Sequence, residues 1–194
     1  MTNLSLEKID QGIKLCIANC YSLLSDGELL YKNKRYPSAF ALFQLCAEEQ
    51  SKVKLLIEIA CKKRADIEIT EEDRKFYNKF FVNHIKKTRH SSASDYTFNQ
   101  FAHKFGLNKI RSDKEIENEK SNPSVLNDLK KSAFYVSLKK QTFQMPSDVI
   151  DKKLCMEIRK NIKTRLSINK STFDYYFNYT YKLVFLYKNN YKKL

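Results

Sequence analysis

Two adjacent glutamates and a lysine interrupt an apolar stretch in the first third of the chain. The segment AEEQSK, residues 47–52, contains Glu48, Glu49 and Lys52, and the apolar spacing around it predicts a helix. At 100° per residue, Glu49 falls at the centre of the apolar stripe, whereas Glu48 and Lys52 fall toward its margin. The stripe consists of Leu42, Leu45, Cys46, Val53, Leu56 and Ala60. A carboxylate at its centre needs a hydrogen bond or a counter-charge, because a lone buried charge is costly.

The next predicted helix offers a partner for this carboxylate. Three aromatic residues share a face with His84, and Lys87 continues that face downstream. The aromatic residues are Tyr77, Phe80 and Phe81. Aromatic packing that gives way to hydrogen-bonding groups is typical of a cleft wall.

Acid–base chemistry is one use for such a pair. Long helices joined by a short link pack antiparallel, so Glu49 could face His84, and a buried carboxylate beside an imidazole holds its tautomer. We therefore predict a catalytic group of Glu49, Lys52, His84 and Lys87. The alternative is a scaffold hydrogen bond without catalytic function.

Other chemical signals are weaker. A metal site from Glu48, Glu49 and His84 would have suitable ligand types but lacks repeated ligand spacing, so we expect neither a metal nor a cofactor. His103 has no polar cluster nearby and is predicted to be a helix-surface residue. The sequence contains no Gly-rich phosphate loop, no Ser-His-Asp arrangement and no nucleotide-binding fingerprint.

Composition favours a mainly α-helical protein. The 194 residues include only three glycines and three prolines, so few turn residues are available to separate strands. The N-terminal residues do not resemble a signal peptide, and no apolar run approaches the ~20 residues that cross a bilayer. We therefore expect a cytoplasmic chain that does not bind membranes. The five cysteines form no CxxC pair and are predicted to be reduced core residues.

The formal net charge of +14 has two explanations. Such a charge attracts polyanions, and RNA is therefore a candidate ligand. A genome rich in A and T would also produce many lysines on solvated surfaces. Charge alone does not choose between them.

Periodicity predicts an antiparallel helical bundle with one polar interruption. We expect residues 1–105 to form the helical core, residues 106–128 a polar, mobile excursion, and residues 129–194 a hairpin and C-terminal helices that pack on the same domain. Within the core, the predicted helices span about 6–34, 37–65 and 70–88, and the last has Thr70 as N-cap. A further helix is expected over about 148–166.

The aromatic tail after this helix has two interpretations. Phe173, Phe177 and Tyr181 recur at helical spacing. They could stack on nucleic-acid bases, or they could form the half-buried face of a last helix.

Three segments together resemble the AbiV family of abortive-infection proteins. The first is NCYSLLSDGELLYKNKRYPSAFALFQLCAEEQSKVKLL, the second is NHIKKT, and the third is AFYVSLKKQTFQMPSDVI. The resemblance covers roughly residues 15–88 and 129–150, and the tail beyond Asp151 is not matched. It implies a bacterial anti-phage protein with a core similar to the HEPN superfamily, many of whose members are metal-independent ribonucleases.

The chain departs from the HEPN ribonuclease pattern. Those enzymes use an Arg and a His separated by four to six residues at a dimer interface. Here Lys79 takes the place of that Arg before His84, and Arg89 and His90 are adjacent to each other. A ribonuclease activity would therefore need a variant group built on His84.

The resemblance leaves three functional classes open. The first is an effector that cleaves RNA or interferes with translation after infection, as a homodimer that a phage-encoded protein activates. The second is a non-catalytic protein that blocks a phage or host component through its basic or aromatic surface. In the third, Glu49 and His84 serve only the scaffold.

Overall fold

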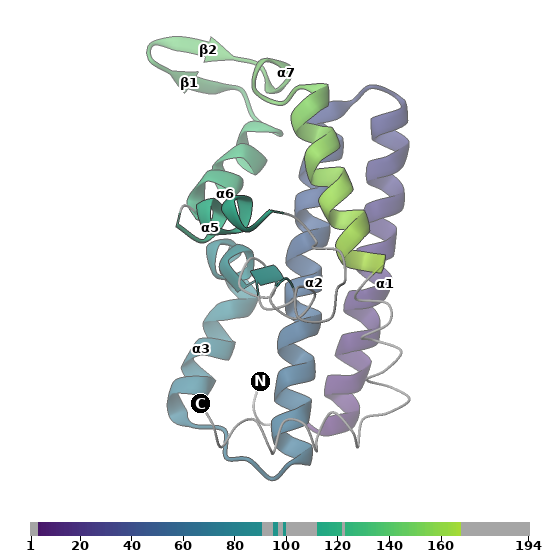
Figure 1. The fold of residues 1–194 in the computed structure, drawn as a ribbon, viewed down its shortest axis with the longest axis vertical. Coiled ribbons are helices and arrows are strands. Elements are labelled where there is room, and N and C mark those ends of the chain that lie inside the picture. Colours follow the sequence, from purple (N-terminus) through teal and green to yellow (C-terminus); the bar gives the residue numbers. More distant parts are fainter. Residues whose placement is uncertain (1–3, 91–94, 97–98, 100–111, 122, 168–194) are drawn as a thin grey trace.

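The computed structural model describes residues 4–90, 95–96, 99, 112–121 and 123–167, and these form a mainly α-helical protein with one small antiparallel hairpin (Figure 1). The elements in chain order are α1 (Leu6–Lys32), α2 (Tyr36–Arg64), α3 (Glu71–Val82), a helix over residues 84–90, α5 (Asp113–Ser121), α6 (Pro123–Ser132), β1 (Ser137–Lys139), β2 (Thr142–Gln144), α7 (Pro146–Val149) and a helix over residues 152–167. The predicted fold class is confirmed. No helix among the described residues is long and apolar enough to span a bilayer.

The long helices α1 and α2 form an antiparallel pair, and α6 and α7 contact α2 (Figure 1). One apolar cluster joins the start of α2 to the helix over residues 152–167. A second cluster joins the far half of α2 to α3 through Tyr77 and Phe80. Glu48 and Ser51 lie on α2 between these two apolar regions, where the helix has buried polar side chains.

The beginning of α3 follows the local rules that predicted it. The Thr70 hydroxyl accepts a hydrogen bond from the Asp73 backbone N–H at 3.1 Å, and the Asp73 carboxylate accepts one from the Thr70 N–H at 3.1 Å. Reciprocal bonds of this kind satisfy two donors that a helix start leaves unbonded. The predicted N-cap is confirmed.

The predicted polar excursion over residues 106–128 is wrong for its described part. Residues 113–121 and 123–132 are helical, as α5 and α6, whereas residues 106–111 lie outside the described residues. Ser112 caps α5 through reciprocal hydrogen bonds with Glu115, and Ile116 anchors the helix in the interior. A helix with a single apolar anchor has too little periodicity to be recognised from sequence.

The hairpin forms where it was predicted, but its apolar face is uncovered. Leu138 pairs with Phe143 across the strands, and these side chains are 62% and 75% exposed. Lys140 and Gln141 adopt positive φ angles of 47° and 64°, which a two-residue hairpin turn requires. In Figure 1 the hairpin projects from the bundle instead of lying on it.

The helix predicted over 148–166 is divided in the structure. α7 ends at Val149, and a second helix spans residues 152–167, with the Asp151 carboxylate accepting a hydrogen bond from the Leu154 N–H at 2.8 Å. Arg159 in this helix binds Glu28 of α1 through two hydrogen bonds of 2.6 and 2.7 Å. The tail residues Phe173, Phe177 and Tyr181 lie outside the described residues. All five cysteines are free thiols, and four of them are buried.

Two glycines of α1 provide a test of how closely α1 and α2 approach. A Cβ atom at Gly27 would lie 2.6 Å from the Phe43 ring, whereas one at Gly12 would lie 3.5 Å from Leu56. We expect Gly27→Ala to lower the free energy of unfolding by about 1–3 kcal/mol, since the buried ring must move. Gly12→Ala should raise it by about 0.5–1 kcal/mol through helix propensity. Urea unfolding measures both, and equal effects of the two variants would contradict the close approach.

Candidate functional site

A break after α3 places the helix that contains His84. Asn83 has extended backbone angles, φ −109° and ψ 107°, and its side-chain oxygen accepts a hydrogen bond from the Lys86 N–H at 2.9 Å. The prediction of one continuous helix to about residue 88 is therefore wrong. Asn83 ends one helix and caps the next because an asparagine side chain can replace a missing backbone acceptor. The new helix brings His84 and Lys87 to α2.

Ser51 links α2 to the helix over residues 84–90, the short helix. Its side chain is fully buried, and its hydroxyl lies 3.0 Å from the Lys87 carbonyl oxygen and 3.1 Å from the Ala47 carbonyl oxygen. The contact lies on α2 less than one helical turn beyond Glu48. Ser51 thereby fixes where the Lys87 side chain begins.

Three basic side chains converge on the buried carboxylate of Glu48. His84 Nδ1 lies 2.5 Å from Glu48 Oε2, and Lys87 Nζ lies 3.3 Å from the same oxygen. Lys130 Nζ, from α6, lies 2.5 Å from Glu48 Oε1 and 3.1 Å from His84 Nδ1. Glu48, Lys87 and Lys130 are buried, whereas the His84 side chain is 49% exposed. The group thus consists of three buried charged side chains and one imidazole that is open to solvent.

The neighbours of Glu48 keep its carboxyl group ionised. Burial alone would raise the pKa of Glu48. Hydrogen bonds from Lys130 and His84 and the positive charges of Lys130 and Lys87 outweigh burial, so the pKa of Glu48 lies below its ordinary value. An ionised carboxylate is therefore present at neutral pH.

The ionised carboxylate determines which nitrogen of His84 is available. A carboxylate oxygen can only accept, so the short contact to Glu48 requires the proton on Nδ1. The Lys130 ammonium cannot donate to a protonated Nδ1, and its hydrogen bond is the one to Glu48. In neutral His84 the Nε2 lone pair is then free to accept a proton, as a general base requires.

The group also has more positive than negative charge. Lys87 and Lys130 are two cations opposite one carboxylate, and each ammonium has three donors. Buried donors that are fixed in place stabilise a developing oxyanion more than solvated donors do. A base beside surplus cations is an arrangement suited to phosphate chemistry.

Comparison with known proteins identifies the family. The family model HEPN_AbiV, described as AbiV, matches residues 8–166, which include every member of this group. The chain belongs to the AbiV family. It is therefore a HEPN-like protein, and membership associates the AbiV-family chain with abortive-infection defence. No match was found among curated proteins or among solved structures.

The structure divides the predicted catalytic residues of this AbiV-family chain into two pairs. His84 and Lys87 meet at a carboxylate, but it belongs to Glu48. Glu49 instead pairs with Lys52 on the same helix, and both are partly exposed. The predicted contact between Glu49 and His84 is corrected accordingly.

The error has a physical reason in the packing of α2. One side of α2 packs on α1, where burial and the nearby Glu49 carboxylate raise the pKa of the Cys16 thiol to about 11. Another side packs on α6 and the short helix, where Glu48 lies. A helix buried on two sides has no single stripe whose centre marks the deepest residue.

Lys130 was missed by sequence reasoning, although a signal existed. It shares an apolar stripe with Leu126, Leu129 and Ala133, at the i, i+3, i+4 and i+7 positions of a helical face. A lysine inside an apolar stripe indicates a buried counter-charge in the same way as the glutamate did.

The remaining candidates do not join the group. Lys79 is exposed on α3, and Arg89 is exposed beyond it. His90 packs edge-on against Phe80 with ring centres 5.2 Å apart, and burial together with the charge of Lys54 lowers the pKa of His90 to about 4. His103 lies outside the described residues.

The metal alternative also lacks support in the described part of the chain. There, no group of three or more histidine, cysteine or carboxylate side chains could hold a metal ion. Glu48, Glu49 and His84 accordingly do not form the cluster that the alternative required.

Proposed function

We propose that this AbiV-family chain is an abortive-infection effector that cleaves RNA after phage infection, with His84 as the general base. The observation that supports it best is the 2.5 Å contact between Nδ1 of the half-exposed His84 side chain and the buried Glu48 carboxylate. Family membership supports the defence role. Loss of intact RNA would stop translation in the infected cell.

The proposed reaction uses the neighbouring 2′-hydroxyl of the RNA. His84 Nε2 takes its proton, the 2′-oxygen attacks the adjacent phosphorus, and the bond from phosphorus to the 5′-oxygen breaks. The ammonium groups of Lys87 and Lys130 stabilise the charge on the phosphate oxygens. The 5′-oxygen leaves with a proton from the imidazolium, so the products are a 2′,3′-cyclic phosphate and a 5′-hydroxyl.

Control of such an activity is part of the proposal. A protein that damages the RNA of its own cell must be inactive until infection, so we propose activation by a phage-encoded protein. We also propose that the effector works as a homodimer, as the family resemblance implies.

Mapping of RNA 5′ ends in phage-infected cells tests the function. Cells with the wild type should contain new 5′-hydroxyl ends that are absent from cells with the His84→Ala variant and from cells with an empty vector. The variant must be shown to accumulate in folded form. Intact RNA together with full phage resistance would contradict cleavage and indicate the second class, a non-catalytic protein that blocks a phage or host component.

A further inference from the structure

The chain from Arg74 to His90 contains no acidic residue. It includes six cations, which are Arg74, Lys75, Lys79, Lys86, Lys87 and Arg89. The acidic residues of α3 are all in its first turn, where the positive end of the helix dipole favours them. The rest of α3 and the helix over residues 84–90 therefore have a charge of one sign.

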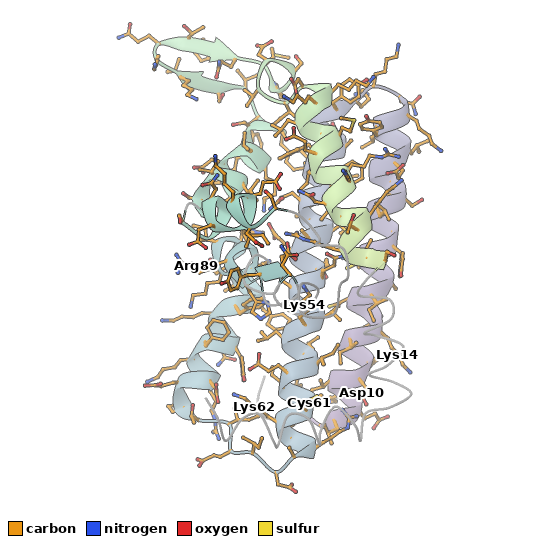
Figure 2. All side chains as sticks on the ribbon, viewed as in Figure 1. Asp10, Lys14, Lys54, Cys61, Lys62 and Arg89 are labelled. Carbon is orange, nitrogen blue, oxygen red and sulfur yellow. The ribbon has the colours of Figure 1, made fainter. Side chains whose placement is uncertain are left out.

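The positive charges of this segment are largely on the outside. Tyr77 and Phe80 point into the core, whereas Lys75 and Lys79 are one turn apart on the exposed side of α3. Figure 1 shows α3 beside α2, so this exposed side faces away from the bundle. Figure 2 shows Arg89 near the end of α3 from which His84 follows. We name the exposed side chains of Arg74, Lys75, Lys79 and Arg89 the basic face.

The cations of the basic face are available to a ligand. Lys75, Lys79 and Arg89 form no salt bridge with any described residue. Arg159 and Lys163 on the helix over residues 152–167 differ, because both bind Glu28. Positive charge without a protein partner attracts a polyanion, which releases counterions when it binds.

An aromatic ring lies within the same surface. Phe76 is 39% exposed, and Lys86 Nζ lies 5.5 Å from its ring centre. The Phe76 ring also packs against the Phe80 ring, with 5.8 Å between the two ring centres. A supported, exposed ring among cations can stack on an unpaired base, which a duplex does not offer.

We propose that single-stranded RNA binds along the basic face, with its phosphates on Lys75, Lys79 and Arg89 and a base on Phe76. The strand then runs along α3 toward His84, which begins the next helix after Asn83. The inference rests on the proposed function in that the bound strand is the RNA that His84 cleaves. The binding surface can nevertheless be tested without cleavage.

Binding of a labelled single-stranded 2′-O-methyl oligonucleotide by the full chain tests the surface. This probe lacks the attacking hydroxyl, so fluorescence anisotropy reports binding alone. The double variant Lys75→Gln/Lys79→Gln should weaken binding about tenfold and reduce the slope of log K against log salt by about 1.4. The matched control Lys152→Gln/Lys153→Gln removes the same charge from exposed positions elsewhere and should change the affinity less than about threefold.

A third variant isolates stacking. Phe76→Leu keeps an apolar side chain without a ring face and should weaken binding about fivefold or more. Equal losses for the two lysine pairs, equal binding of a duplex probe, an unchanged affinity in Phe76→Leu or no binding by the wild type would each overturn the inference. Binding with this pattern by a protein that cleaves no RNA in phage-infected cells would instead contradict the proposed function and leave the inference standing.

Discussion

Glu48→Ala will lower the free energy of unfolding by about 3–5 kcal/mol, because it leaves two buried ammonium groups without a counter-charge. Lys87 and Lys130 both lie against this carboxylate, and their side chains are only 6% and 9% exposed. Chemical denaturation at neutral pH measures the loss. The adjacent Glu49 is the matched control, since its partner Lys52 is on the same helix and partly exposed. Glu49→Ala should cost less than about 1 kcal/mol.

A second substitution separates the charge from the lost packing. Adding Lys130→Met to Glu48→Ala removes one unpaired cation and should restore part of the stability, so the two effects will not be additive. Two outcomes would show that the buried charges are not coupled in this way. One is an equal loss of stability in Glu48→Ala and Glu49→Ala, and the other is additivity of the effects of Glu48→Ala and Lys130→Met.

The same carboxylate gives this stabilisation a defined pH dependence. The pKa of Glu48 is lower in the folded protein than its ordinary value of 4.5. A carboxyl group whose pKa is lowered by folding stabilises the folded protein at pH values above its pKa in the unfolded state. This contribution disappears as the pH falls through its pKa in the folded state. The difference between wild type and Glu48→Ala should therefore be largest near neutral pH and shrink below about pH 4.5.

If His84 is the general base that we propose, His84→Ala will reduce the rate constant of RNA cleavage by about 10²- to 10⁴-fold. The free energy of unfolding should change little, because the side chain is half exposed and Glu48 keeps both lysines. Single-turnover cleavage by purified protein, with extract of phage-infected cells as the source of the proposed activator, measures the rate.

The second histidine of the same helix is the control for this prediction. His90 packs against Phe80, away from the Glu48 carboxylate. His90→Ala should lower stability yet leave cleavage per folded molecule unchanged. Unchanged cleavage in His84→Ala, or equal losses in the two variants, would exclude His84 as the base.

Features that depend on neighbouring residues could be predicted from the sequence. The capping box joins Thr70 to a residue three positions away, and the hairpin turn is completed within Lys140 and Gln141. The helical blocks, the free cysteines and the family resemblance have the same local basis. The sequence also singled out His84 and Lys87, because both continue the aromatic face of the helix predicted over about 70–88, which the structure divides at Asn83.

Only the tertiary structure decided which carboxylate and which further cation meet His84. Glu48 and His84 are 36 residues apart, and Glu48 and Lys130 are 82 residues apart. Adjacent residues on a helix point about 100° apart, so the choice between Glu48 and Glu49 depends on which face of α2 receives the short helix and α6. That choice follows from packing on both sides of α2 and from the break at Asn83, neither of which a single helical stripe encodes. The sequence by itself therefore determined α1, α2 and the start of α3 and singled out His84 and Lys87, whereas packing determined α5, α6 and the group that forms around Glu48.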